Sequence, residues 1–137
     1  MINLLFVCSG NSCRSQMGEG LARQIADGRF QVKSAGVTPI GVHPAAIASM
    51  REIGIDISDQ TSDLLTGELL EWTDFVITLC NQARDHCPAI PPGVRHIHWD
   101  IPNPDQLYLS PEDRNRQFAA VRDLIKERIE TLFKEIK

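Results

Sequence analysis

A cysteine and an arginine stand six positions apart in the stretch FVCSGNSCRS, residues 6–15. Successive backbone N–H groups in a tight loop form a concave anion site, and small residues let the backbone close around a tetrahedral oxyanion. Arg14 can clamp two oxygens of the anion, its charge favours a nucleophilic thiolate at Cys8, and Ser15 can hydrogen-bond that sulfur. The predicted binding residues are Ser9, Gly10, Asn11, Ser12, Cys13, Arg14 and Ser15.

Short apolar runs that are typical of strands alternate along the chain with segments of helical periodicity. These elements must position the loop. Strands are predicted over residues 2–7, 30–33, 74–79 and 95–99, and helices over 15–26, 44–53 and from Ser110 onward. The last helix begins with Ser110 as N-cap and Pro111 in its first turn, and its apolar stripe runs from Phe118 to Ile136. This order predicts an α/β three-layer sandwich with a four-stranded parallel sheet and helices on both faces.

In such a fold, ligands bind beyond the carboxyl ends of the parallel strands. Cys8, Ser34, Cys80 and Asp100 each follow one of the predicted strands. We therefore expect these side chains, which are distant in sequence, to share one edge of the sheet.

The chain as a whole is typical of one small globular domain over residues 1–137. Its net charge of -4 and dispersed basic residues provide no stripe for nucleic acid. The apolar start MINLLFVC lacks a basic segment and is short, so we expect neither a signal peptide nor a membrane span. We expect a cytoplasmic monomer without an organic cofactor. Four cysteines then indicate catalysis, redox chemistry or metal binding rather than a disulfide scaffold.

The stretches FVCSGNSCRSQMGEG, KSAG, GIDISDQTSD and VITLCNQARDHCP resemble the thioredoxin-coupled arsenate reductases, which share the fold of low-molecular-weight protein tyrosine phosphatases. The similarity extends over nearly the whole chain. The resemblance implies arsenate as substrate and thioredoxin as reductant. It also implies a potassium ion beside the loop, a hard cation that oxygen ligands suit. The matching positions are Asn11, Glu19, Ser34, Thr61 and Asp63.

Electron counting gives roles to two further thiols, Cys80 and Cys87. A thiolate at Cys8 would form an adduct with arsenic(V), which can leave as arsenite only when a second thiol supplies electrons. Attack by Cys80 would leave a Cys8–Cys80 disulfide, and attack by Cys87 on Cys80 would free Cys8. The resemblance implies the same relay, with thioredoxin reducing the Cys80–Cys87 bond. If residues 80–87 were helical, their ends would lie roughly 10 Å apart, so the segment would have to rearrange.

Two other functions remain open: a phosphotyrosine phosphatase that uses Cys8 and Arg14, and a non-enzymatic module that binds an oxyanion or metal. A zinc site could draw on Cys80, Cys87, His86, His96 and His98, although no CxxC spacing supports it. The chain also departs from the family, because Asn103-Pro104 stands where an Asp-Pro acid is usual. An amide cannot donate the proton, so Asp100, Asp105 or water must.

Overall fold

The computed structural model describes residues 1–26, 28–106 and 108–136, so Asp27, Leu107 and Lys137 of the predicted domain lie outside the described residues. The elements, in chain order, are β1 (Ile2–Cys8), α1 (Arg14–Ile25), β2 (Phe30–Gly36), α2 (Pro44–Arg51), α3 (Gly67–Trp72), β3 (Phe75–Thr78), α4 (Asn81–Asp85), β4 (Arg95–His98) and α5 (Pro111–Glu135).

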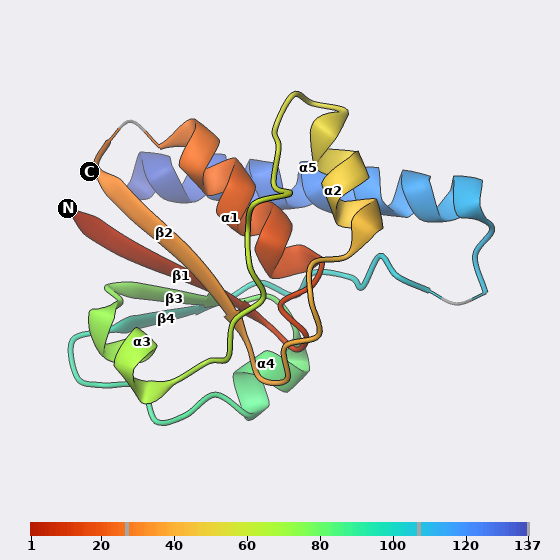
Figure 1. Cartoon of the computed structure of the whole chain (residues 1–137). Helices are drawn as coiled ribbons and strands as arrows, with labels where there is room; N and C mark the ends of the chain where they lie inside the picture. The colour runs from red at the N-terminus through yellow and green to blue at the C-terminus, as the bar shows by residue number, and fades with distance from the viewer. Residues whose placement is uncertain (27, 107, 137) are drawn as a thin grey trace.

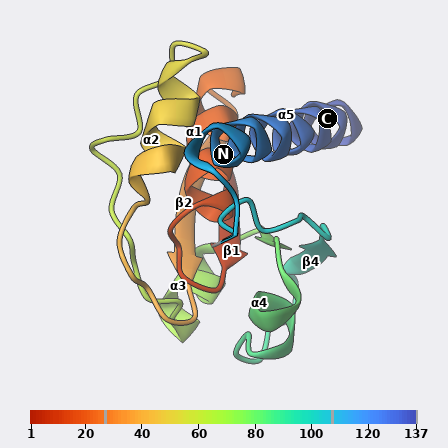
Figure 2. The same ribbon diagram turned by 90° about the vertical axis from the view of Figure 1, so that its right-hand side faces the viewer.

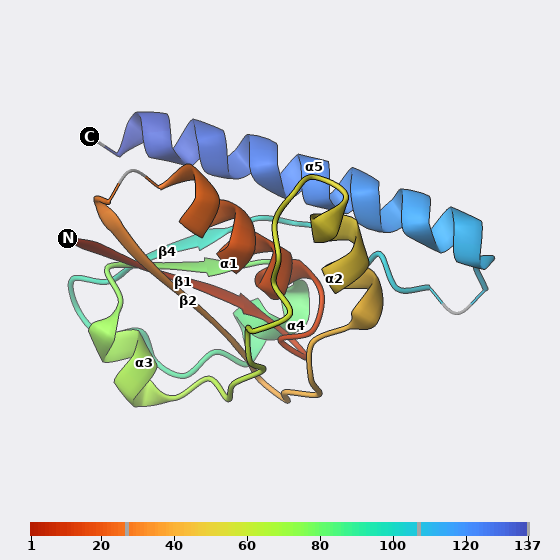
Figure 3. The ribbon, with the colours of Figure 1, turned by 45° about the horizontal axis from the view of Figure 1, so that its top comes forward.

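The strands form a parallel sheet in the order β2-β1-β3-β4 (Figure 1). Helices α1, α2 and α5 lie on one face of the sheet, and α3 and α4 lie on the other, as Figures 2 and 3 show from two further directions. This arrangement confirms the predicted three-layer α/β sandwich. Among the described residues, none of the helices is both long enough and apolar enough to cross a membrane.

The central strand β1 is apolar on both sides because helices cover both faces of the sheet. Residues Leu4 to Val7 are completely buried. Helix α1 approaches β1 closely at Gly18, where an added Cβ would lie 3.0 Å from the ring of Phe6. The loop is held at both ends, because the strand that precedes it and the helix that follows it pack tightly against each other.

The long helix α5 confirms the predicted start and apolar stripe. The hydroxyl of Ser110 accepts a hydrogen bond from the backbone N–H of Asp113 at 3.2 Å, and Pro111 follows it. The buried residues of the helix include Phe118, Val121, Ile125, Ile129 and Leu132.

The structure corrects the prediction in three places. Strand β2 continues to Gly36 instead of ending at Lys33, so Ser34 lies opposite Phe6 inside the sheet and not at its edge. Ser34 can be buried there because its hydroxyl donates a hydrogen bond to Glu19 Oε1 at 2.6 Å. Helix α2 ends at Arg51, two residues earlier than predicted, and the short helices α3 and α4 were not predicted from the sequence.

Candidate active site

The loop between β1 and α1 is fixed through its carbonyl oxygens. Backbone N–H groups of the segment that follows β2 donate to four of them: Val37 to Cys8 (3.4 Å), Thr38 to Ser9 (2.8 Å), Ile40 to Gly10 (3.0 Å) and His43 to Ser12 (3.1 Å). Among the described residues, the backbone N–H groups of residues 9–14 donate no hydrogen bond to any partner. With the carbonyls held outward, these N–H groups are available to bind an anion together with the start of α1.

Asn11 maintains the shape of this loop from behind. Its backbone has a φ of 45°, a left-handed conformation that asparagine tolerates better than most residues. Its fully buried side chain donates to Ser15 Oγ at 2.7 Å and accepts from the backbone N–H of Asp63 at 2.8 Å. Asn11 and Ser15 therefore lie beneath the loop, whereas Ser9, Gly10, Ser12, Cys13 and Arg14 line the cavity above it.

The sulfur of Cys8 lies at the base of this cavity and is 3% exposed. Its only hydrogen-bond partner among the described residues is Ser15 Oγ, at 2.9 Å. Because that oxygen already accepts from Asn11, its own hydrogen is free to point at the sulfur. A hydroxyl donor directed at Cys8 stabilises the thiolate form, which is the nucleophilic form of cysteine.

Arg14 is anchored at the wall of the cavity. Its Nη1 donates to the backbone carbonyl of Ile101 at 2.9 Å, in the segment that follows β4. This contact fixes the guanidinium while leaving other N–H groups for a ligand. The cavity has a volume of about 120 Å³, which is of the size for a small inorganic anion, and its remaining lining residues are Ile40, His43, Asn103 and Asp105.

Cys13 also lines the cavity, but its chemistry differs from that of Cys8. Burial raises the pKa of the Cys13 thiol to about 12. At neutral pH this thiol stays protonated, so Cys13 is a poor nucleophile.

Cys80 leaves the sheet at the same edge as Cys8. Strand β3 is hydrogen-bonded to β1 with Val7 opposite Thr78, and the next residue, Leu79, donates its N–H to the carbonyl of Val7 at 2.9 Å. Cys80 is 8% exposed and is the N-cap of α4, where its sulfur accepts the N–H of Ala83 at 3.3 Å. The predicted placement of Cys8 and Cys80 at one edge of the sheet is therefore confirmed.

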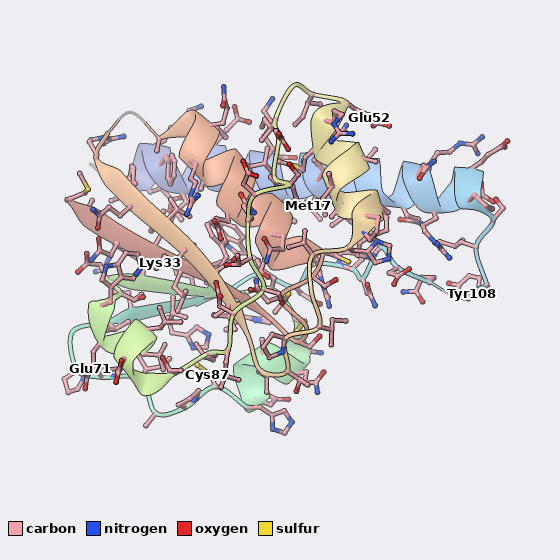
Figure 4. The ribbon with its side chains drawn as sticks, in the orientation of Figure 1. Met17, Lys33, Glu52, Glu71, Cys87 and Tyr108 are labelled. Carbon is pink, nitrogen blue, oxygen red and sulfur yellow. The ribbon has the colours of Figure 1, made fainter. Side chains whose placement is uncertain are left out.

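Cys87 follows the other end of α4. It is half-buried, and burial raises the pKa of its thiol. Figure 4 shows the Cys87 side chain next to α4, on the side of the sheet that carries α3 and α4. All four cysteines are free thiols, and the α4 helix separates Cys80 from Cys87.

A second cavity contains four of the five residues matched to a potassium site. Glu19, Ser34, Thr61 and Asp63 line it, whereas the fifth residue, Asn11, does not line it and is linked to Asp63 through the backbone N–H of that residue. Burial is the main cause that raises the pKa of Glu19, and the charge of Asp63 raises it further. Two carboxylates and two hydroxyls fit a hard cation, which would relieve this repulsion. Arg23 already supplies a positive charge to Glu19, because its Nη2 lies 2.9 Å from Glu19 Oε2.

Two of the five residues considered as zinc ligands, His96 and His98, contact the same hydroxyl group. Thr78 Oγ1 lies 2.9 Å from His96 Nε2 and 2.8 Å from His98 Nδ1. In the part of the chain that the structure describes, three His, Cys, Asp or Glu side chains are nowhere grouped as a metal ion would need.

Sequence reasoning missed His43 as part of the cavity. The structure places His43 at the cavity wall, beside Asn103 and Asp105. Asp100, the other acid considered, is exposed and does not line the cavity. A histidine before proline is a weak signal, because its role here depends on a residue more than sixty positions away in the chain.

Comparison with known proteins agrees with this geometry. Residues 3–137 match the family described as low molecular weight phosphotyrosine protein phosphatase. The chain belongs to this family. Within it, the chain is 45% identical over 128 residues to a protein from Halalkalibacterium halodurans named arsenate reductase, covering 93% of this chain and 92% of that one. It is 46% identical over 132 residues to arsenate reductase 1 of Staphylococcus haemolyticus, covering 96% and 94%.

Solved structures give the same fold. An arsenate reductase in the phosphate binding state superposes with a TM-score of 0.78 at 37% identity, covering 100% of both chains. A thioredoxin-dependent arsenate reductase of Corynebacterium glutamicum superposes with a TM-score of 0.81 at 30% identity, covering 99% of this chain and 62% of that one. A tyrosine phosphatase from T. tengcongensis shares the fold with a TM-score of 0.81 at 24% identity.

Proposed function

We propose that this chain is an arsenate reductase that works by a relay between Cys8, Cys80 and Cys87 and is regenerated by thioredoxin. The observation that carries the proposal is the position of Cys80 at the carboxyl edge of β3, directly beside the strand that ends in Cys8. A phosphatase needs only the Cys8 thiol and Arg14, so the additional thiols at this edge favour reduction. Relatives at 45% and 46% identity that are named arsenate reductases support the same choice.

The first step is capture of the oxyanion and attack by sulfur. Arsenate binds to the N–H groups of residues 9–14 and to the guanidinium of Arg14. These donors stabilise the negative charge of the transition state. The Cys8 thiolate, with Ser15 as its hydrogen-bond donor, forms a sulfur–arsenic bond while one arsenic–oxygen bond breaks. The departing oxygen leaves as water.

The second step is reduction. The Cys80 sulfur attacks Cys8, the sulfur–arsenic bond breaks, and its electron pair remains on arsenic. Arsenic(V) thereby becomes arsenic(III), and two thiols become the Cys8–Cys80 disulfide. Cys80 needs little rearrangement to approach Cys8 in this step, because β1 and β3 are adjacent in the sheet.

The third step transfers the disulfide to Cys87 and opens α4. The five-residue helix α4 lies between the two cysteines, and a segment 80–87 that was helical throughout would hold their α-carbons roughly 10 Å apart, which exceeds the reach of a disulfide. When Cys80 enters a disulfide, its sulfur leaves the N–H of Ala83 that it caps, and loss of a cap costs a helix about 0.5–2 kcal/mol. The oxidation itself therefore destabilises the five-residue helix. Unwinding also exposes Cys87. Before this step, burial raises the pKa of the Cys87 thiol and keeps it protonated.

The proposed last step is attack by thioredoxin on the Cys80–Cys87 disulfide, which restores both thiols. We also propose that potassium binds at Glu19, Ser34, Thr61 and Asp63, where its charge would stabilise the carboxylates behind the loop. Thioredoxin is a reductant of reducing compartments, so the proposal places the enzyme in the cytoplasm. We propose that it acts there as a monomer.

Thiol titration combined with arsenite release tests the relay. With arsenate and no reductant, the wild-type protein should release arsenite and lose two of its four free thiols. Thioredoxin, its reductase and NADPH should then make turnover continuous. Cys87→Ser should stop after one arsenite per chain, and Cys80→Ser should release none.

The two other functions give different results. A phosphotyrosine phosphatase would release no arsenite from arsenate, and its hydrolysis of phosphotyrosine would be unchanged in the Cys80→Ser and Cys87→Ser variants. A binding module would keep all four free thiols after arsenate is added. Either result would overturn the proposal.

A further inference from the structure

We infer that Asp105, positioned by His43, is the general acid that protonates the leaving oxygen in this chain. The inference rests on the proposed reaction at the same cavity and concerns the position at which Asn103 replaces the usual acid. Both Asp105 and His43 line the cavity that contains Cys8. They reach it from separate parts of the chain, His43 from the start of α2 and Asp105 from the segment between β4 and α5.

The hydrogen bonds of His43 define its tautomer. Its Nδ1 accepts the backbone N–H of Ala45 at 2.9 Å and thereby caps α2. An acceptor nitrogen carries no hydrogen, so the ring proton of the neutral imidazole must be on Nε2. That nitrogen lies 3.3 Å from Asp105 Oδ2. His43 consequently presents a donor to the Asp105 carboxyl group, and both of its nitrogens are occupied, so it acts as a positioning residue.

Three groups hold the Asp105 side chain and its backbone in place. His43 faces Oδ2, and Arg114 Nε lies 3.6 Å from Oδ1. This Arg114 nitrogen is buried and has no hydrogen-bond partner among the described residues, and the Asp105 carboxyl group lies within ion-pair distance of it. The backbone N–H of Asp105 donates to Asn103 Oδ1 at 3.0 Å. Asn103 thus supports the loop that carries the acid, although its amide cannot donate the proton itself.

The chemistry requires a proton at this wall of the cavity. When the Cys8 sulfur bonds to arsenic, a hydroxyl must leave, and it leaves as water only when a proton accompanies it. A bound arsenate next to Asp105 places two negative groups side by side, which favours a proton shared between them. Asp105 gives this proton to the leaving hydroxyl as the arsenic–oxygen bond breaks. The resulting carboxylate is then stabilised by His43 Nε2–H and by Arg114.

Leaving-group dependence separates an acid from a structural residue. Two aryl phosphates would be compared at the same cavity: p-nitrophenyl phosphate, whose leaving group needs little protonation, and phenyl phosphate, whose leaving group needs a proton. Asp105→Asn should lower kcat roughly 10²-fold for arsenate and phenyl phosphate, but by far less for p-nitrophenyl phosphate. Binding of inorganic phosphate should change less than about threefold, because the anion donors are intact.

Three companion variants complete the experiment. Asp113→Asn makes the same chemical change at an exposed residue outside the cavity and should leave all rates unchanged. His43→Asn keeps a good cap for α2 but cannot reach Asp105, so it should have a partial defect with the same dependence on leaving group. Adding Asn103→Asp to Asp105→Asn returns a carboxyl group to the cavity wall and should recover part of the lost kcat.

The possible failures are distinguishable. If Asp105→Asn lowers kcat equally for all substrates, or for none, Asp105 is not the acid. Arsenite release by the wild-type protein would in that case still support the proposed function. If the wild-type protein releases no arsenite, the proposed function fails, and the two aryl phosphates still decide the role of Asp105. A wild-type protein inactive toward arsenate and both esters would overturn both.

Discussion

Gly36 lies against the anion-binding loop, and replacing it with alanine is expected to disturb that loop directly. A Cβ at this position would lie 2.7 Å from the backbone nitrogen of Asn11 and 2.9 Å from the carbonyl oxygen of Ser9, well inside the 3.4 Å of ordinary contact. Both atoms belong to the backbone, so no side-chain rotation can relieve the overlap. Gly36 is itself fixed, because its N–H donates to Asp63 at 2.8 Å and its carbonyl accepts from Leu65 at 2.8 Å.

The loop must therefore move when Gly36→Ala is made. Overpacking of this kind costs about 1–3 kcal/mol in the free energy of unfolding. Displaced N–H donors should also weaken phosphate binding by about tenfold, which corresponds to about 1.4 kcal/mol. Urea unfolding and phosphate titration by calorimetry measure the two effects. Gly67→Ala is the matched control, because a Cβ there meets nothing within 4 Å and the residue begins α3. Wild-type stability and phosphate affinity in Gly36→Ala would refute the description of the loop.

Two further predictions concern the residues behind the loop. Ser15→Ala removes the donor to Cys8 and leaves the Asn11 amide unsatisfied. The free energy of unfolding should therefore fall by about 1–3 kcal/mol. Alkylation of Cys8 at pH 7, followed by peptide mapping, should be slower than in the wild type, and alkylation at the wild-type rate would contradict this. Burial raises the pKa of Glu19, so the stability it contributes is present below its unfolded pKa and is lost as pH rises. Glu19→Gln should consequently gain stability relative to wild type as pH rises from 4.5, the ordinary pKa of a glutamate, through the raised pKa of Glu19. The variant should also lose any preferential rise in Tm with potassium over sodium. An unchanged pH dependence, or an intact potassium effect, would contradict this.

Local sequence was enough to predict the parts of the site that follow from one strand–loop–helix unit. Cys8, Arg14 and Ser15 are placed by the end of β1 and the start of α1, and their spacing together with the small polar loop between a strand and a helix indicates an anion site with a thiol. Cys80 required one further assumption, that the sheet is parallel, and the structure confirms it.

The remaining features depend on tertiary contacts that a sequence pattern does not contain. Ser34 was predicted at the sheet edge because the strand was expected to end at Lys33, whereas burial against Glu19 lets β2 continue to Gly36. Helix α4 is only five residues long, too short for a clear helical period, and it depends on Cys80 as its cap. The contact of His43 with Asp105 arises only when the start of α2 and the segment between β4 and α5 meet at the cavity.

The most direct test of the relay is disulfide mapping of Cys87→Ser after a single addition of arsenate without reductant. Peptide mass spectrometry should find a Cys8–Cys80 disulfide, with Cys13 still reduced, and one arsenite released for each disulfide formed. Arsenite release without this disulfide, or a Cys8 that remains a free thiol, would contradict the transfer of electrons from Cys80 across the edge of the sheet.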